Sequence, residues 1–163
     1  SINHLSWMLS NMLINEYIWM LYFCFYSFLS VTIVMIFNMF KMFHFNQLTS
    51  LFLESKYFKL SMFINLLSLG GLPPFLGFIP KWITIQYLLI NNQMFLAIIL
   101  IIATLITLFF YLRMCFSSFM LNSYENNWMV ASNLNSFYSN IYMFSSFISI
   151  MGLPLFSMIY IML

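Results

Sequence analysis

The sequence has 163 residues, of which 64% are hydrophobic and only 5% are charged, and its formal net charge is +2. Soluble domains carry about 25% charged residues, so this composition excludes a soluble globular domain and predicts an all-α integral membrane protein. A net charge this small gives no indication of nucleic-acid binding.

Two apolar segments come first in the chain. Residues 1–14 are too short to cross a bilayer, which needs ~20 residues, so we interpret them as a truncated helix and expect the chain to be a fragment. Residues 17–40 carry no charge and would extend roughly 36 Å as a helix, enough for a full span. Tyr17 and Trp19 at its start are typical of an interfacial aromatic belt. The more polar residues 41–59 are expected to form either a loop or an interfacial amphipathic helix.

An interrupted hydrophobic segment follows. Residues 60–90 would extend roughly 46 Å as one straight helix, longer than the ~30 Å hydrocarbon core. Glycines and prolines near its middle add backbone freedom and remove N–H donors, which predicts two half-helices, one ending near Leu72 and the other beginning at Pro80. The interrupting residues are Gly70, Gly71, Pro73, Pro74, Gly77 and Pro80. We therefore expect one discontinuous transmembrane helix.

Two further spans complete the predicted bundle. Residues 94–120 and 137–163 are each long and apolar, and Gly152 and Pro154 are expected to kink the last span. The sequence thus predicts a single membrane domain over residues 1–163, with about four full spans in addition to the truncated helix.

The charged loops predict how the bundle is oriented. Because spans alternate sides, the loops 41–59 and 121–135 lie on one side, which also holds Lys41, Lys56 and Lys59. The turns on the opposite side carry no positive charge. By the positive-inside rule, the charged side faces the cytoplasm or, in a mitochondrion, the matrix.

Lys81 is the strongest candidate for chemistry, because it directly follows the interruption and no other charge lies between Leu60 and Leu112. A charge at the bilayer centre costs at least ~2.5–3.5 kcal/mol. The N-terminal end of the second half-helix also disfavours a cation, whereas the free carbonyls at the end of the first half-helix favour one. We expect Lys81 to act as a proton relay; the alternative is a structural lysine that caps those carbonyls.

The remaining polar residues have both functional and structural interpretations. His4 is either a proton relay or a hydrogen-bonded packing residue. Four residues near the interruption either line a water path or form helix–helix hydrogen bonds. They are Ser61, Asn65, Ser68 and Thr84. Lys41 and Arg113, near span ends, are expected to snorkel to the interface. The expected headgroup-facing surface comprises His44, Glu54, Lys56 and Lys59.

No site for a redox cofactor or a metal is evident in the sequence. It contains no dinucleotide-binding fingerprint, no phosphate-binding loop and no cysteine cluster, so this chain alone is not expected to hold NADH, FMN or an iron–sulfur cluster. Cys24 and Cys115 lack the spacing of a metal site and are expected to be small, buried apolar residues. No acid lies at membrane depth, so an ionic partner for Lys81 is expected in another segment or subunit.

A motif around the interruption resembles a known family. The stretch Ser68–Trp82, SLGGLPPFLGFIPKW, resembles subunit 2 of mitochondrial NADH:ubiquinone oxidoreductase (complex I, NADH dehydrogenase) in an insect-like form. The segments Ser1–Leu5, Leu105–Arg113 and Glu125–Trp128 resemble it too, so the likeness covers essentially the whole chain. It implies an antiporter-like helical bundle whose discontinuous helix bears a lysine, by position Lys81, on the proton route. The glutamate and two lysines that this family carries on earlier helices have no counterpart, so the chain resembles the C-terminal half.

The resemblance implies a proton-translocating membrane-arm subunit that helps couple NADH-to-ubiquinone electron transfer to proton pumping in the mitochondrial inner membrane. The chain would be part of that respiratory-chain translocase without a redox site of its own, and NADH, FMN, iron–sulfur clusters and ubiquinone are expected elsewhere in the complex. Expected partners are other membrane-arm subunits, the missing N-terminal half and the lipid bilayer. The alternatives are a secondary cation/proton antiporter subunit and a structural packing subunit without its own proton path.

Overall fold

The computed structural model describes residues 1–41, 44, 56–120, 136–154 and 157–158, and no strand occurs among them. Its main helices are α1 (Ile2–Met12), α2 (Glu16–Met39), α4 (Lys56–Gly70), α5 (Phe78–Ile90), α6 (Met94–Met120) and α7 (Ser136–Ile150). Two of them, α2 and the part of α6 between Met94 and Phe116, are long and apolar enough to cross a membrane. The apolar parts of α4 and α5 are shorter than a span.

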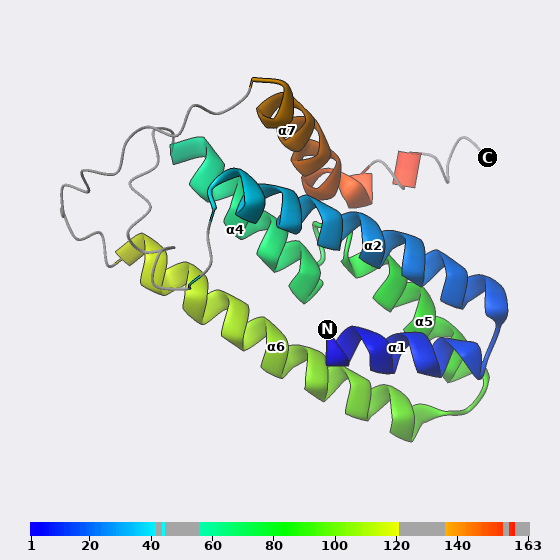
Figure 1. Ribbon diagram of the computed structural model, residues 1–163. Coiled ribbons are helices and arrows are strands. Elements are labelled where there is room, and N and C mark those ends of the chain that lie inside the picture. The colour runs from blue at the N-terminus through cyan, green and yellow to red at the C-terminus, as the bar shows by residue number, and fades with distance from the viewer. Residues whose placement is uncertain (42–43, 45–55, 121–135, 155–156, 159–163) are drawn as a thin grey trace.

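The helices form a bundle in which α4 and α5 follow one another alongside α2 (Figure 1). Helix α6 also contacts both α4 and α5. The first helix, α1, packs on α2, α5 and α6, whereas α7 packs on α2 and α4. In Figure 1 the last turn of α2, the start of α4 and the end of α6 lie at the same end of the bundle.

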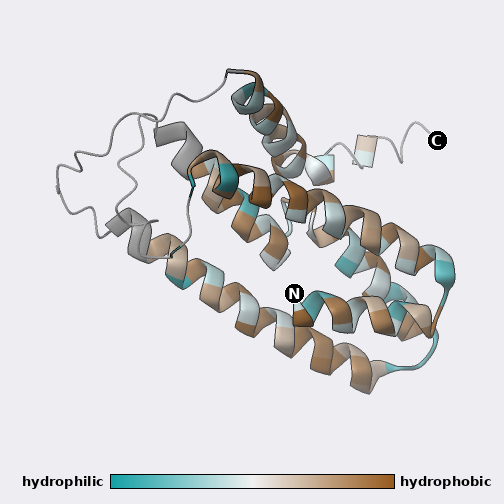
Figure 2. Cartoon of the chain, viewed as in Figure 1, coloured by the Kyte–Doolittle hydropathy of each residue, from teal (hydrophilic) through white to brown (hydrophobic). Residues whose placement is uncertain are grey.

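Hydropathy explains where the helices begin and end. Figure 2 shows hydrophobic residues along α2 and α6 and hydrophilic ones at the turns that join α1 to α2 and α5 to α6. The side chain of Asn15 caps α2 by accepting a hydrogen bond from the backbone N–H of Tyr17 at 3.1 Å. Glu16 is the first residue of α2, where a carboxylate is favoured by the helix dipole.

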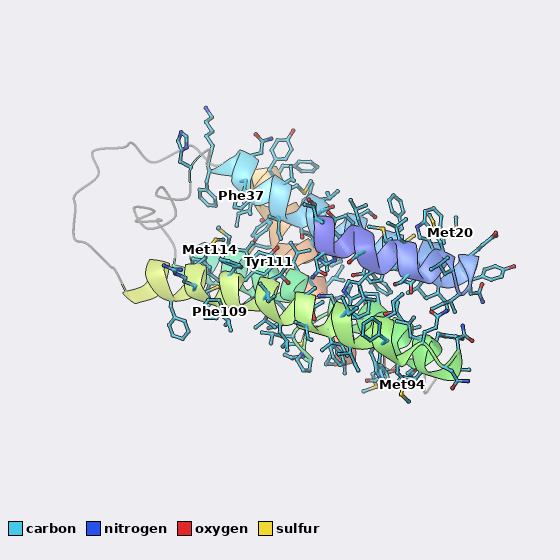
Figure 3. All side chains as sticks on the ribbon, turned by 90° about the horizontal axis from the view of Figure 1, so that it is seen from below. Met20, Phe37, Met94, Phe109, Tyr111 and Met114 are labelled. Atoms are coloured by element: carbon cyan, nitrogen blue, oxygen red, sulfur yellow. The ribbon has the colours of Figure 1, made fainter. Side chains whose placement is uncertain are left out.

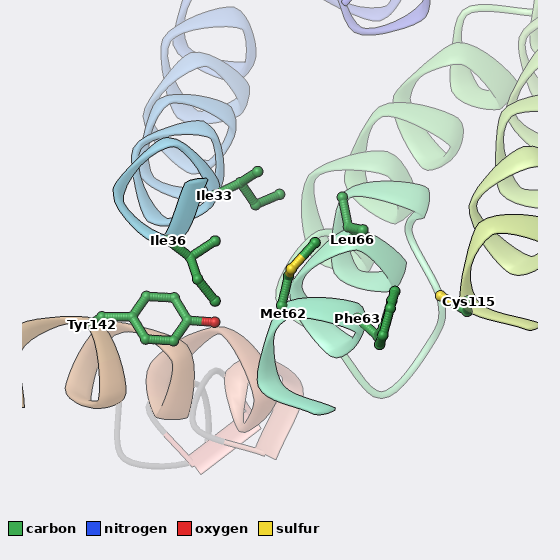
Figure 4. Close-up of a cluster of buried hydrophobic side chains, with 7 residues drawn as sticks. All are labelled: Ile33, Ile36, Met62, Phe63, Leu66, Cys115 and Tyr142. Atoms are coloured by element: carbon green, nitrogen blue, oxygen red, sulfur yellow. The ribbon is translucent and has the colours of Figure 1, made fainter. Parts of the chain in front are cut away.

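Two clusters of buried apolar side chains hold the bundle together. Figure 4 shows the first, which joins α2, α4, α6 and α7 through Ile33, Ile36, Met62, Phe63, Leu66, Cys115 and Tyr142. The second joins α1, α2, α5 and α6 through Trp7, Met8, Tyr22, Leu88, Ala97 and Leu100. Because lipid is as apolar as leucine, these clusters stabilise the fold by close packing rather than by removing surface from water.

The outer face of α6 is apolar and exposed. In Figure 3, Phe109 points away from the bundle, and 61% of its surface is exposed, whereas Tyr111 packs against the first cluster. A wide exposed apolar face is what a hydrocarbon environment requires. Cys24 lies on the exposed surface, which corrects the expectation that both cysteines are buried; Cys115 is buried. The sequence cannot distinguish a lipid-facing cysteine from a buried one, because both stand in apolar runs.

Two helix ends differ from the sequence expectation. Helix α4 begins at Lys56, so part of the segment 41–59 is helical and continuous with α4; residues 42–43 and 45–55 lie outside the described residues. Helix α7 ends at Ile150, and after Met151 the described residues 152–154 and 157–158 are helical again. Pro154 has no N–H to donate to the carbonyl of Ile150, so the helical hydrogen-bond ladder is interrupted at this point.

Candidate functional site

The last turn of α4 ends in a glycine cap. Gly71 has a φ of +83°, a left-handed conformation that glycine adopts without strain. The N–H of Gly71 donates to the carbonyl of Ser68 at 3.0 Å, and that of Leu72 lies 3.5 Å from the carbonyl of Leu67. This pattern is a Schellman motif, and it satisfies two of the four carbonyls that a helix end leaves free.

A short non-helical segment, residues 71–77, joins α4 to α5. It is built from successive turns, in which the N–H of Phe75 donates to the carbonyl of Leu72 and that of Phe78 donates to the carbonyl of Phe75, both at 3.1 Å. Pro80 is the third residue of α5, within the first turn, where its missing N–H removes no helical hydrogen bond. Helix α5 thus begins at Phe78, two residues before the start expected from the sequence.

Lys81 reaches back from α5 to the carbonyls that the glycine cap leaves free. Its ammonium donates to the carbonyl of Gly70 at 2.9 Å and to that of Leu69 at 3.4 Å. Only 6% of Lys81 is exposed, so these carbonyls are buried partners of a buried cation. All four terminal carbonyls of α4 are therefore satisfied, two by backbone N–H groups and two by one lysine.

Gly71 makes room for the lysine. A Cβ atom at this position would lie 2.7 Å from Nζ of Lys81 and 2.9 Å from its Cδ. The sequence singled out Gly71 only as a residue that interrupts a helix. Its second role depends on a side chain ten residues later folding back over it, and sequence spacing alone does not predict that contact.

His4 lies in the interior of the bundle, next to two tyrosines of α2. Its Nδ1 is 3.0 Å from the hydroxyl of Tyr22, and its ring lies 4.8 Å from the ring of Tyr26, measured between centroids. His4 is 9% exposed, and the positive charge of Lys81 is close enough to act on it electrostatically. The contact between α1 and α5 thus brings the two sequence-predicted relay residues into the same interior.

The four polar residues near the interruption are buried but differ in their partners. Ser61 and Asn65 reach another helix, because both contact the hydroxyl of Tyr142 on α7, at 3.0 and 3.1 Å. Ser68 and Thr84 instead donate to carbonyls of their own helices. Sequence reasoning missed Tyr142, since nothing in the sequence indicates which face of α7 meets α4.

A second feature missed in the sequence is a set of unpaired polar atoms on α1. Among the described residues, both side-chain polar atoms of Asn11 and the indole Nε1 of Trp7 are buried without a hydrogen-bond partner. Trp7 and Asn11 are four residues apart, so they lie on one face of α1, which His4 also occupies. The four-residue spacing of Trp7 and Asn11 in the sequence could have indicated that they share one buried face.

The other charged residues that the structure describes lie at the surface. Lys41, His44 and Arg113 are exposed. Glu54 lies outside the described residues, and the side chains of Lys56 and Lys59 are not described either. No group of three or more histidine, cysteine or acidic residues that could hold a metal ion occurs within the described part of the chain.

Comparison with known proteins gives consistent matches over both parts of the chain. Residues 1–107 match the profile of the transmembrane region of the NADH:quinone oxidoreductase/Mrp antiporter family. Residues 108–160 match the profile of the NADH dehydrogenase subunit 2 C-terminus.

Individual relatives are similar over the whole of this chain. NADH-ubiquinone oxidoreductase chain 2 of Anopheles gambiae is 55% identical over 163 residues, and that of Aedes aegypti is 50% identical. The match covers 100% of this chain but 48% of each of these relatives, so the chain spans about half their length. The Anopheles albimanus relative is 50% identical, and 96% of its length is covered.

Proposed function

Because the chain belongs to the NADH-ubiquinone oxidoreductase chain 2 family, we propose that it is a proton-translocating membrane-arm subunit of respiratory complex I. In this proposal α4 and α5 form one discontinuous transmembrane helix, and Lys81 loads and releases a proton at the interruption. Electron transfer from NADH to ubiquinone, with its FMN and iron–sulfur clusters, takes place elsewhere in the complex. The loops 41–59 and 121–135 face the matrix of the mitochondrial inner membrane.

The observation that supports the proposal most is the environment of the Lys81 ammonium. It is buried, and its hydrogen-bond partners in the described residues are the neutral carbonyls of Gly70 and Leu69. If the partner were a carboxylate, release of the lysine proton would leave an unpaired buried anion. A neutral carbonyl does not carry this cost. His4 and its partner Tyr22 are candidates to continue the route, because both are buried and α1 contacts α5.

The same contacts also support a second function, in which Lys81 is a permanent cap on α4 and this chain has no proton path of its own. A cap must remain charged, whereas a relay must lose its proton. Arginine separates the two roles, because a guanidinium cannot be deprotonated in a protein and still donates to carbonyls. A secondary cation antiporter gains no such support, since no acidic ligand set occurs within the described residues.

The test compares Lys81→Arg and Lys81→Ala in the assembled complex in sealed membrane vesicles. We expect both variants to lower proton pumping per electron while oxidation of NADH by an artificial acceptor stays normal. Arg113→Ala, which removes an exposed cation near the end of α6, is the matched control and is expected to pump normally. Normal pumping in Lys81→Arg would refute the relay and favour the permanent cap.

A further inference from the structure

Helix α7 contacts both α4 and the segment that joins α4 to α5 through a single residue, Ser149. The hydroxyl of Ser149 shares its single hydrogen between Oδ1 of Asn65 on α4 and, at 2.8 Å, the carbonyl of Ser146 in its own helix. The backbone carbonyl of Ser149 accepts the N–H of Leu76, in the joining segment, at 3.1 Å. Ser149 and Asn65 are fully buried. One residue of α7 therefore connects the helix that supplies the carbonyls to the segment that leads to Lys81.

A second polar contact fixes α7 along α4. The hydroxyl of Tyr142, two turns before Ser149, lies 3.0 Å from Oγ of Ser61 and accepts a hydrogen bond from Nδ2 of Asn65 at 3.1 Å. Asn65 thus bonds to α7 at two levels, with its amide nitrogen toward Tyr142 and its amide oxygen toward Ser149. Buried side-chain hydrogen bonds between helices restrict sliding, because any shift would leave polar groups unpaired.

Glycines bring the backbones into direct contact at the same place. A Cβ atom at Gly152, just beyond the end of α7, would lie 2.2 Å from Cβ of Leu76. A Cβ atom at Gly77 would lie 1.9 Å from the carbonyl oxygen of Ser68 in the last turn of α4. No larger residue fits at either position without moving backbone, so α7, the joining segment and α4 form one tightly packed unit.

We propose that α7 positions the Lys81 ammonium on the end of α4, and that Ser149 and Gly152 are the positioning residues. The contact between Nζ of Lys81 and the carbonyl of Gly70 spans the interruption, so its length depends on how α4 and α5 are held relative to each other. Helices α2 and α6 contact both α4 and α5, and α7 adds to them by holding α4 through Asn65 and the joining segment through Leu76. This inference rests on the proposed role of Lys81.

The test uses the assembled complex with Ser149→Ala, which removes the hydroxyl but keeps the backbone carbonyl. We expect the ratio of complexes with Lys81 on the Gly70 carbonyl to those without this contact to fall about tenfold, which is the effect of losing one hydrogen bond. Proton pumping per electron is expected to fall with it. Ser149→Thr restores a hydroxyl and is expected to recover pumping. The matched control is Ser145→Ala, which removes a hydroxyl that donates only along α7, to the carbonyl of Tyr142 at 2.8 Å.

A double-mutant cycle separates positioning from general destabilisation. If α7 acts through Lys81, Ser149→Ala adds no further loss of pumping per assembled complex in the Lys81→Ala background. A loss that adds independently in that background, or normal pumping in Ser149→Ala, would overturn the inference. Normal pumping in Lys81→Ala would instead overturn the proposed function. Gly152→Ala allows a second measurement, because its Cβ forces the joining segment away from α7. A structure of that complex with Nζ of Lys81 still 2.9 Å from the Gly70 carbonyl would also contradict the inference.

Discussion

Replacing Gly71 by alanine is expected to move the Lys81 ammonium off the end of α4. The new Cβ would lie 2.7 Å from Nζ, and the flexible end of the lysine yields more easily than backbone. The left-handed backbone at Gly71 adds strain of ~1–2 kcal/mol for a residue with a side chain. Loss of the charge-assisted hydrogen bond to Gly70 adds about 1.5–3 kcal/mol. Together these effects predict that the folded complex is destabilised by about 2.5–5 kcal/mol.

The neighbouring glycine provides a control one residue away. A Cβ at Gly70 would lie 3.5 Å from Cδ2 of Tyr111, an ordinary van der Waals contact, and alanine favours a helix by ~1 kcal/mol over glycine. Gly70→Ala is therefore expected to leave the site intact. Proton pumping per electron and the thermal stability of the purified complex should fall in Gly71→Ala and stay close to the parent in Gly70→Ala. Equal behaviour of the two variants would refute the reasoning.

Three further predictions concern the other buried polar groups and the exposed cations. Asn65→Leu is expected to lower the stability of the complex by about 1–2 kcal/mol, because it removes hydrogen bonds to α7. Asn11→Leu replaces an amide without a described partner and should be neutral or stabilising. Thermal unfolding of the two complexes checks this, and a destabilised Asn11→Leu would mean that its amide is paired in the membrane. Tyr22→Phe removes the hydroxyl 3.0 Å from Nδ1 of His4 and is expected to slow coupled turnover without changing assembly; an unchanged rate would exclude this pair from the route. Arg113→Gln removes an exposed charge and should leave pumping unchanged, which proton-uptake measurements would test.

Local chemistry alone predicted that the chain leaves the helical conformation between Gly70 and Phe78, whereas the role of Lys81 stays a prediction. Glycines and prolines limit where a helix can continue, and a single charge within a long apolar segment stands out without any knowledge of the fold. The same is true of α6, whose apolar run is bounded by polar residues at both ends. The family resemblance, stated from the motif around Lys81, is confirmed by the matches over the whole chain.

The partners of α4 were not predictable in this way. Asn65 and Tyr142 are 77 residues apart, and Asn65 and Ser149 are 84 apart, so their contacts depend on how two helices pack. Serines recur throughout α7, and the sequence gives no sign that Ser149 faces the interruption while Ser145 does not. The contact of Gly152 with Leu76 was equally hidden, because the sequence predicted only a kink near Gly152, where the structure interrupts the helix at Met151.

The geometry of the interruption explains why small movements there matter. If Lys81 lies at the membrane centre, as proposed, keeping its ammonium there costs about 2.5–3.5 kcal/mol on insertion scales, and each hydrogen bond from a charged donor returns about 1.5–3 kcal/mol. Lys81 makes one such bond at 2.9 Å and a weaker one at 3.4 Å, so the cost and the gain nearly cancel. A shift of α5 away from α4 that lengthened both bonds would remove the gain and leave the cost. In the proposed function, the contacts that hold α4 and α5 together therefore decide whether Lys81 keeps its proton. They run through α2 and α6, which contact both helices, and through α7, which contacts α4 and the joining segment.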